Sequence, residues 1–312
     1  MILVTGANGF VGRALCRDLA GRGLPVRAAV RRRGTLEGAV AVGDLAEATD
    51  WSKALDGVEV VVHLAARVHV MHETLSDPLA AFRTVNVDAS LNLARQCLAH
   101  GVKRFVYVSS IKVNGEVTQP GQPFRHDDVP RPQDPYGISK LEAENGLKAL
   151  ADSRGVELVI VRPPLVYGPG VGANFSRMIE WVRRGVSLPL GAVHNRRALV
   201  YIDNLTDLLV AGCQHRDAAN RMLLVSDGAD VSTTAMLNAI AAALGRPGRL
   251  MPVPAGLVGR VAWLLGQGAV AQRLLGSLEL DIESTQRWLD WVAPIGFEQA
   301  IAATVSAHMA AR

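Results

Sequence analysis

The chain has 312 residues, of which 49% are hydrophobic and 20% charged, and its formal net charge at pH 7 is +4. This composition excludes a disordered chain, and the lack of any long block of like charge argues against nucleic acid as a partner. The three cysteines, Cys16, Cys97 and Cys213, have neither disulfide nor zinc spacing, so no metal is expected. At roughly 150 residues per domain, the length favours two lobes.

Short apolar runs alternate with helical stretches in the first half of the chain. Strands are expected at residues 2–5, 26–30, 58–64, 103–108 and 156–161, and helices at 10–22 and 76–100. This alternation predicts an α/β fold with a doubly wound parallel sheet. After the turn-rich Arg162-Pro163-Pro164 the pattern loosens. Residues 1–165 are therefore expected to form the first domain, and 166–312 mainly a smaller, interleaved lobe with some segments returning to the first domain.

The two apolar segments that could direct the chain to a membrane are both weak. Met1 runs directly into a glycine motif, unlike a signal peptide. The apolar stretch 257–275 is interrupted by Arg260 and Arg273, so no transmembrane span is expected. The chain is thus predicted to be cytoplasmic, although 257–275 can form an amphipathic helix that touches a membrane or a partner.

Glycines at positions 6, 9 and 12 follow the first expected strand and open the first expected helix. Such glycines let the backbone turn tightly and approach a pyrophosphate, and the helix N-terminus offers free N–H groups to that anion. The motif predicts a dinucleotide site in residues 1–165. Its candidate cofactor-binding residues are Gly6, Asn8, Gly9, Phe10, Val11 and Gly12.

The end of the second strand bears on which dinucleotide binds. Sites that prefer NAD usually place an acid there, bonded to the ribose hydroxyls. Here the strand ends in Arg31 and Arg32, which can hold a 2′-phosphate, so NADP is favoured over NAD. Alternatively, these arginines form a solvated loop face. Asp44 and Leu45 are expected beside the adenine.

Tyr136 and Lys140 are spaced to share one helix face, and Asp134 is expected to cap that helix. A nearby ammonium favours the phenolate, so Lys140 is expected to lower the pKa of Tyr136 from about 10 towards neutral. That would make Tyr136 a general acid/base. Ser110 ends an expected strand and can bond the same substrate oxygen. Ser110, Tyr136 and Lys140 are therefore the predicted catalytic residues for hydride transfer between an alcohol or carbonyl and a nicotinamide.

Together these motifs resemble the extended short-chain dehydrogenases/reductases of the NAD-dependent epimerase/dehydratase group, which have a Rossmann domain. The matching pieces are Gly6–Gly12, Asp44-Leu45, His63–Ala66, Asn86, Ser109-Ser110, Tyr136-x-x-x-Lys140, Arg162–Gly170 and Arg197–Asn204. The resemblance implies Tyr136 as acid/base, Lys140 as its partner and a ligand of the nicotinamide ribose, and Ser110 as the third member. It also implies further cofactor-lining residues, namely Leu64, Ala65, Ala66, Asn86, Val108 and Pro163.

The family's substrates are mostly nucleotide sugars, which implies a UDP-sugar substrate here. Asn174 resembles the family's substrate-contacting asparagine, and Arg197 its diphosphate-binding arginine, with Arg196 as the alternative. Lys112 is a further candidate for contact with the sugar or diphosphate, or else a solvated loop residue. Sugar-nucleotide dehydratases carry an acid pair directly after the Ser/Thr of the triad. Ile111 and Lys112 occupy those positions, so dehydration is not expected.

The choice of reaction within the family follows from two departures. An acid is absent after the second strand, and Asn114 replaces the tyrosine of the epimerases' usual Ser-x-x-Val-Tyr-Gly. The chain therefore resembles the bacterial polysaccharide and O-antigen branch that interconverts UDP-4-keto-6-deoxy-N-acetylglucosamine and UDP-N-acetylquinovosamine, so a 4-ketoreductase is expected. The alternatives are a redox-neutral UDP-sugar 4-epimerase and a non-catalytic dinucleotide-binding regulator. Family members often dimerise, so a homodimer is expected. Residues 76–100 and 141–150 can form its interface, or can instead pack in the core.

Overall fold

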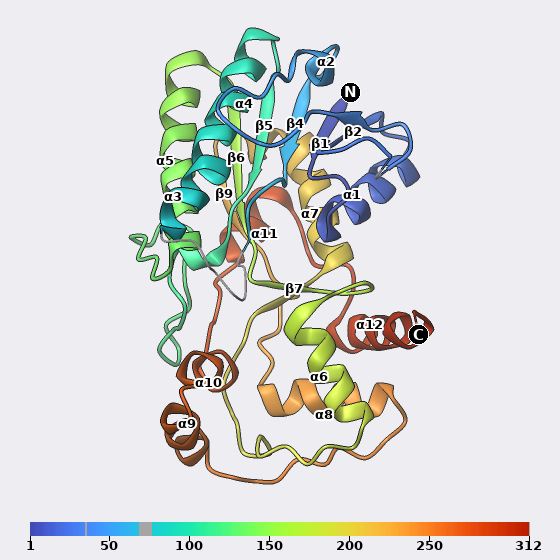
Figure 1. Ribbon diagram of the computed structural model, residues 1–312, viewed down its shortest axis with the longest axis vertical. Coiled ribbons are helices and arrows are strands. Elements are labelled where there is room, and N and C mark those ends of the chain that lie inside the picture. Colours follow the sequence, from blue (N-terminus) through green and yellow to red (C-terminus); the bar gives the residue numbers. More distant parts are fainter. Residues whose placement is uncertain (35, 69–76, 312) are drawn as a thin grey trace.

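One half of the molecule is built around a parallel sheet (Figure 1). The computed structural model describes residues 1–34, 36–68 and 77–311. Seven strands lie in the order β3-β2-β1-β4-β5-β6-β9, and every neighbouring pair is parallel. Their bounds are β1 Ile2–Thr5, β2 Val26–Val30, β3 Val40–Ala41, β4 Val60–His63, β5 Arg104–Val108, β6 Glu157–Arg162 and β9 Met222–Leu224. The predicted doubly wound parallel sheet is confirmed, with each expected strand within two residues of its observed ends.

The sheet is buried on both faces because successive side chains of a strand point to opposite sides. Val4 and Val62 lie in the core beneath α1 and α7, and their neighbours Leu3 and Val61 lie in the core beneath α4 and α5. Helices thus cover both faces of the sheet. The helices of this half are α1 Phe10–Gly21, α2 Ser52–Leu55, α3 Pro78–Arg83, α4 Ala89–Ala99, α5 Pro135–Arg154, α7 Ile202–Gln214 and α11 Glu283–Leu289, with short turns η2 Ile111–Val113 and η3 Arg216–Ala218.

The long helix expected at 76–100 is helical but not uniform. Between α3 and α4 the chain forms a π-helix, η1 Thr84–Asp88, and Asn86 lies within it. Ser76, the expected first residue, lies outside the described residues. A π turn inside an α-helix redirects side chains and often accompanies a functional site. Here it brings the buried Asn86 amide towards α5, where it donates to Ser139 Oγ at 3.0 Å.

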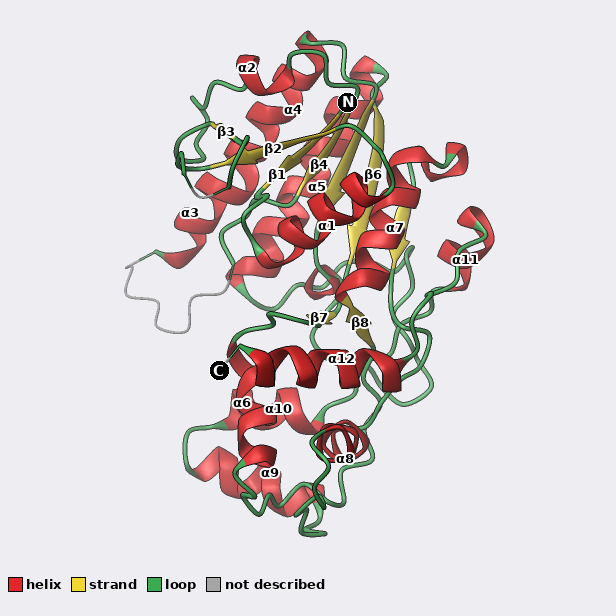
Figure 2. Cartoon of the chain, turned by 90° about the vertical axis from the view of Figure 1, so that its right-hand side faces the viewer, coloured by secondary structure: helices red, strands yellow, loops and turns green. Residues whose placement is uncertain are grey.

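The other half is a mainly helical lobe with its own core (Figure 2). Phe175 and Ile179 of α6 pack there with Leu237 and Ile240 of α8 and with Ile301 of α12. The elements of this half are β7 Leu165–Tyr167, β8 Leu199–Tyr201, α6 Ala173–Arg183, α8 Thr233–Ala243, α9 Ala255–Leu264, α10 Gly268–Leu275 and α12 Phe297–Ala310. Between them the chain returns to the sheet through α7 and β9. No helix in the described ranges combines the length and the apolarity needed to cross a membrane.

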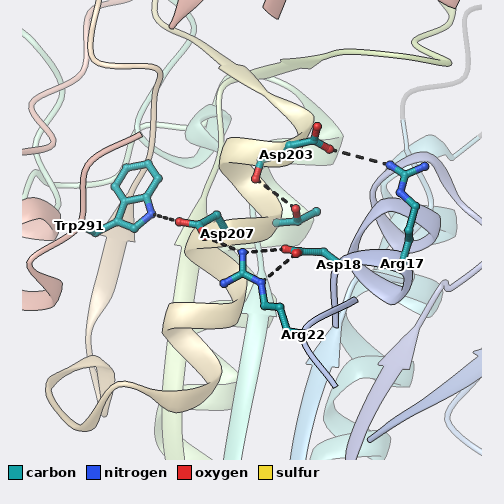
Figure 3. Close-up of polar contacts among 7 residues, drawn as sticks. Arg17, Asp18, Arg22, Asp203, Asp207 and Trp291 are labelled. Atoms are coloured by element: carbon teal, nitrogen blue, oxygen red, sulfur yellow. Dashed lines mark hydrogen bonds and ion pairs between the residues drawn. The ribbon is translucent and has the colours of Figure 1, made fainter. Parts of the chain in front are cut away.

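A polar clamp joins α1 to α7 on one face of the sheet (Figure 3). Arg22, the C-cap of α1, donates to Asp18 at 2.8 Å and to Asp207 of α7 at 2.6 Å. The other oxygen of Asp207 accepts a hydrogen bond at 2.7 Å from the indole of Trp291, which follows α11. These contacts hold α1 against α7, and thereby hold the start of α1 in place at the site described next.

Candidate functional site

A cleft of about 860 Å³ opens where the central strands end. The strand order reverses direction between β1 and β4, and ligands of such sheets bind outside the carboxyl ends of the strands at that point. Most of the predicted site residues line this cleft. They are Gly6, Asn8, Gly9, Phe10, Val11, Gly12, Arg31, Asp44, Leu45, Leu64, Ala65, Ala66, Val108, Ser110, Tyr136, Lys140 and Pro163.

The glycine turn has no room for side chains. Gly6 has φ +65°, and a Cβ there would lie 2.9 Å from the backbone nitrogen of Ala65. A Cβ at Gly12 would lie 2.2 Å from the carbonyl oxygen of Gly6. Gly9 is the N-cap of α1, and no side chain caps that end of the helix. The turn therefore presents backbone N–H groups to the cleft at a helix N-terminus, which suits a diphosphate.

A chain of buried hydrogen bonds supports the cleft from beneath. The hydroxyl of Ser90 donates to the carbonyl of Asn86 at 2.7 Å, so it accepts from His63 Nε2 at 2.9 Å. His63 Nδ1 then accepts from the Thr5 hydroxyl at 2.7 Å. Burial lowers the pKa of His63 to about 3, with a further lowering from Lys140, so the ring is neutral. Thr5 Oγ1 in turn accepts from the backbone N–H groups of Leu64 and Ala65, both at 3.1 Å.

The network continues to the helix that carries Tyr136. Asn86 Nδ2 donates to Ser139 Oγ, and the Ser139 hydroxyl donates to the carbonyl of Tyr136 at 2.8 Å. Asn86 therefore does not line the cleft as expected, because it is almost fully buried beneath it. Its side chain instead connects the backbone of Arg67, which follows β4, to Ser139 in the first turns of α5, while its main-chain carbonyl accepts from Ser90.

Local sequence starts α5 at the cleft. Asp134 is the N-cap, and its carboxylate accepts from the Gly137 amide at 2.7 Å, while Pro135 occupies the first turn. Tyr136 and Lys140 then lie on one side of the helix and both line the cleft. Lys140 Nζ donates to the carbonyl of Val108 at the end of β5, at 2.9 Å, and lies 5.9 Å from the centre of the Tyr136 ring.

The expected lowering of the Tyr136 pKa is not found. Desolvation, followed by the charge of Asp134, raises the pKa of Tyr136 to about 12, although hydrogen bonding with Ser110 lowers it in part. The larger effect is on Lys140, because burial lowers its pKa to about 7 while Glu144 raises it in part. Burial disfavours the charged form of both groups, the phenolate of Tyr136 and the ammonium of Lys140. Lys140 is therefore the group that titrates near neutral pH.

Glu144, one turn after Lys140, is a supporting residue that the sequence reasoning missed. Its carboxylate accepts hydrogen bonds from Arg162 Nε, at 2.9 Å, and from Arg162 Nη2. Both side chains are almost fully buried. Arg162 Nη1 also donates to Asn114 Oδ1 at 2.8 Å. This pair ties α5 to the end of β6. The spacing of Tyr136, Lys140 and Glu144 at four-residue intervals was the available signal.

Arg31 lines the cleft as predicted, at the end expected to hold the adenosine, and an acidic residue lies close to it. Arg31 Nε lies 3.6 Å from Asp44 Oδ1, and both side chains are exposed. Asp44 and Leu45 line the cleft, as expected for residues beside the adenine, but the contact of the Asp44 carboxylate with Arg31 was not predicted. Arg32 is exposed and does not line the cleft. Arg67 and Val85 line the cleft without having been predicted, because neither belongs to a motif.

Of the predicted substrate residues, Ser110 lines the cleft, whereas Lys112, Arg196 and Arg197 do not. Lys112 Nζ donates hydrogen bonds to the carboxylates of Glu116, at 3.1 Å, and Asp134, so its positive charge is already paired within the chain. Arg196 lies 3.4 Å from Asp230 and 3.3 Å from Glu279. Arg197 has no carboxylate partner among the described residues and donates to the carbonyl of Gly276 at 3.0 Å. The side chain of Asn174, in α6, lies outside the described residues.

Comparison with known proteins adds three findings. A family described as NAD dependent epimerase/dehydratase matches residues 2–225. A Vibrio cholerae protein named UDP-glucose 4-epimerase is 43% identical, over 99% of this chain and 96% of its own. A Stenotrophomonas maltophilia protein named 2-alkyl-3-oxoalkanoate reductase is 32% identical, over 79% of this chain and 76% of its own.

Solved structures resemble the whole chain. MoeE5 in complex with UDP-glucuronic acid and NAD has a TM-score of 0.79 at 26% identity, with 100% of this chain and 99% of that one covered. The UDP-glucuronic acid 4-epimerase from Bacillus cereus in complex with NAD has a TM-score of 0.80 at 21% identity, with 99% of each chain covered. The second likeness shows the fold alone.

Proposed function

The chain belongs to the NAD-dependent epimerase/dehydratase family, and from that premise we propose that it is a UDP-sugar 4-epimerase. Its substrate class would be UDP-glucose or UDP-N-acetylglucosamine. The observation that carries the proposal is the likeness along the whole chain to the Vibrio cholerae protein named UDP-glucose 4-epimerase. This is the alternative weighed in the sequence analysis, and the comparisons support it better than the ketoreductase expected there.

The cleft fits a nicotinamide dinucleotide. The Gly6–Gly12 turn and the start of α1 would hold its diphosphate, because a Cβ at Gly6 or Gly12 would collide with backbone there. Asp44 and Arg31 would meet the adenosine ribose, and Lys140 the nicotinamide ribose. The cofactor would supply a reversible acceptor of hydride from C4 of the sugar.

The chain's own residues would move the proton. Tyr136 would accept the proton of the C4 hydroxyl in its phenolate form, when that carbon is oxidised to a ketone, and as the phenol it would return the proton to the oxygen on reduction. Ser110 donates a hydrogen bond to the same oxygen. Lys140, held by the Val108 carbonyl and titrating near neutrality, sets the electrostatic field around the phenol. Arg197, which has no carboxylate partner among the described residues, is proposed to bind the UDP diphosphate together with Asn174.

A ketoreductase is the second candidate, and one observation favours it. An epimerase reuses its bound cofactor, whereas a reductase must release it after each turnover. Arg31, rather than an acid, ends β2 at the cleft, and both Arg31 and Asp44 are exposed. This open end favours exchange of the cofactor. The reaction would then be reduction of UDP-4-keto-6-deoxy-N-acetylglucosamine to UDP-N-acetylquinovosamine, or the reverse, in polysaccharide synthesis.

Product analysis distinguishes the two reactions. The purified protein is incubated with UDP-glucose and, separately, with UDP-N-acetylglucosamine, and products are identified by NMR. An epimerase forms the C4 epimer without net consumption of cofactor. In a second assay the protein receives UDP-4-keto-6-deoxy-N-acetylglucosamine with excess NADH or NADPH. Many turnovers of cofactor with a single C4 epimer as product would establish the reductase instead, and inactivity in both assays would contradict both proposals.

The predicted preference for NADP is tested in the same assays. If Arg31 binds the 2′-phosphate, Arg31→Ala lowers the kcat/KM for NADPH relative to NADH by about threefold to tenfold, because an exposed charged hydrogen bond contributes modestly. Arg32→Ala is the matched control, since Arg32 does not line the cleft. An unchanged cofactor ratio in Arg31→Ala would remove the argument for NADP and leave Asp44 as the ribose-binding group.

A further inference from the structure

The apolar stretch 257–275 forms a pair of short helices at the far end of the lobe from the sheet (Figures 1 and 2). Helices α9 and α10 pack on each other, and a Cβ at Gly259 would lie 3.5 Å from Leu275. The inner side of the pair also reaches the lobe core through Val258 and Leu274. We call residues 255–275 the α9–α10 hairpin.

The outer side of the hairpin is also apolar, but nothing in the described chain covers it. Among the described residues, fifteen large apolar side chains are exposed, and seven of them lie in residues 251–270. Trp263, Leu264 and Leu265 are 73%, 76% and 71% exposed, and no residue of α9 is fully buried. A helix that is apolar all round is normally buried. Leu257, Val261, Leu264 and Leu265 recur at helical spacing and therefore form one continuous exposed stripe.

The charges around this stripe have one sign. Residues 231–278 contain no Asp or Glu, and their charged residues are Arg246, Arg249, Arg260 and Arg273. Arg260 and Arg273 are exposed on the hairpin itself, and neither forms an ion pair with a described residue. A shallow apolar depression beside the stripe is lined by Gly256, Gly259, Arg260, Trp263 and Leu264. Apolar side chains with a tryptophan, flanked only by arginines, match the chemistry of an anionic bilayer surface.

We propose that the α9–α10 hairpin docks this protein on an anionic lipid surface. The exposed stripe and the neighbouring Trp263 would insert at the headgroup boundary, and Arg260 and Arg273 would contact the phosphates. The ten residues of α9 span about 15 Å, which is too short to cross a bilayer, so the helix is expected to lie along the membrane surface. A second copy of the chain fits the hairpin less well. In a two-fold contact the patch would meet itself, and its arginines would face arginines with no acid in 231–278 to pair with them.

The docked hairpin would hold the substrate side of the molecule towards the lipid. Asn195 Nδ2 donates to the carbonyls of Leu274 and Gly276, at 3.1 and 2.9 Å, where α10 ends. Arg197 donates to the same Gly276 carbonyl. The hairpin is thus fixed to the segment that carries the proposed diphosphate-binding arginine. The docking itself depends on neither the epimerase nor the reductase proposal, since the hairpin contributes no residue to the cleft.

Vesicle co-sedimentation of the whole protein tests the proposal. One set of vesicles contains phosphatidylglycerol and phosphatidylcholine in equal parts, and the other phosphatidylcholine alone. The wild type is expected to sediment with the anionic vesicles, less at high salt, and weakly with the neutral ones. Trp263→Ser with Leu264→Ser should lower the bound-to-free ratio at least about tenfold, because most of the inserted apolar area is lost. Arg260→Glu with Arg273→Glu should abolish the preference for anionic vesicles.

The matched control is Val129→Ser with Val292→Ser, which removes two side chains that are equally exposed elsewhere, at 74% and 72%. It should bind vesicles as the wild type does. Circular dichroism and the turnover assay establish that each variant is folded, and the charge variant alone tests the proposal if the serine variant is not. The proposal is overturned if the wild type stays in the supernatant or if the control loses binding equally. It is also overturned if sedimentation velocity shows a dimer that the Trp263/Leu264 variant dissociates, because a second copy would then cover the hairpin.

Discussion

The floor of the cleft buries polar side chains, whereas the α9–α10 hairpin exposes apolar ones. Beneath the cleft, the side chains of Thr5, His63 and Ser90 are buried, and each has a hydrogen-bond partner. On the hairpin, Trp263 and Leu264 are exposed without a covering element. A satisfied buried network stabilises one arrangement of the backbone. An exposed apolar stripe adds little to the stability of the isolated chain, because its area stays in contact with water in both the folded and unfolded states.

This contrast separates two roles. The cleft region is held together by the chain's own hydrogen bonds, since the ends of β1 and β4 are connected to the start of α5 through Asn86 and Ser139. The hairpin gains its favourable interactions only from something outside the chain. Substitutions in the cleft region should therefore change chemistry and stability, whereas substitutions on the hairpin should change association alone.

Replacing Tyr136 by Phe should have the largest effect on activity. It removes the group that carries the proton, so turnover is expected to fall about 10²- to 10⁴-fold, while cofactor affinity stays within a few-fold. Tyr167→Phe is the matched control, because the Tyr167 hydroxyl donates to Asp227 at 2.8 Å, outside the cleft. Steady-state kinetics and cofactor titration measure both. If Tyr136→Phe keeps full turnover, or if a regulatory output persists without turnover, the catalytic assignment is wrong.

Replacing Glu144 by Gln should have a large effect on stability. It leaves the Arg162 charge buried without its partner, which typically costs about 3–5 kcal/mol. The double variant Glu144→Gln with Arg162→Met should recover part of that loss. Urea denaturation measures the free energies. The exposed pair Lys103–Glu59 is the control, and Lys103→Met is expected to produce no measurable shift. Equal, small effects at the two pairs would show that burial does not control this interaction.

His63 should make stability depend on pH. Its pKa is about 3 in the folded chain and about 6.5 when unfolded. At a pH between these values, His63 is protonated in the unfolded chain and neutral in the folded chain. The free energy of unfolding should therefore fall by about 1.4 kcal/mol for each pH unit from 6.5 down to about 3, with no further slope from His63 outside this range. His63→Gln should remove this part of the slope, whereas His100→Gln, at an exposed histidine, should leave it in place. A slope that survives in His63→Gln would contradict the burial argument.

The smallest expected effect lies on the hairpin. Trp263→Ala should change the free energy of unfolding by less than about 0.5 kcal/mol, as for other exposed positions. Trp51, which is 1% exposed between the sheet and α4, provides the contrast, and Trp51→Ala should cost about 3–5 kcal/mol. Thermal or urea unfolding of the two variants is the measurement. A large loss in Trp263→Ala would mean that the hairpin stabilises the lobe itself, and would weaken the contrast drawn above.

Much of the cleft followed from local sequence. The Gly6–Gly12 turn, the strand ends and the Tyr136/Lys140 pair depend on residues close together in the chain, where spacing alone decides which side chains share a face. Arg31, Asp44 and Leu45 were also predicted cofactor residues, but the contact between Arg31 and Asp44 did not follow from local sequence. Asp44 reaches Arg31 only because β2 and β3 pair in the sheet, and strand pairing is not a local property.

The sequence by itself determined the α/β fold, the position of the dinucleotide motif and the identity of the residues that face the cleft from β1, β5 and α5. It did so because glycine geometry, helix periodicity and strand alternation are set within a few residues. Only the tertiary structure decided the ionisation of the site, because desolvation depends on everything packed around a group. Burial raises the pKa of Tyr136 and lowers that of Lys140, which reverses the expectation for the tyrosine. The tertiary structure likewise decided that Asn86 supports the cleft from below, that Arg162 pairs with Glu144, and that the stripe at Trp263–Leu265 faces outward.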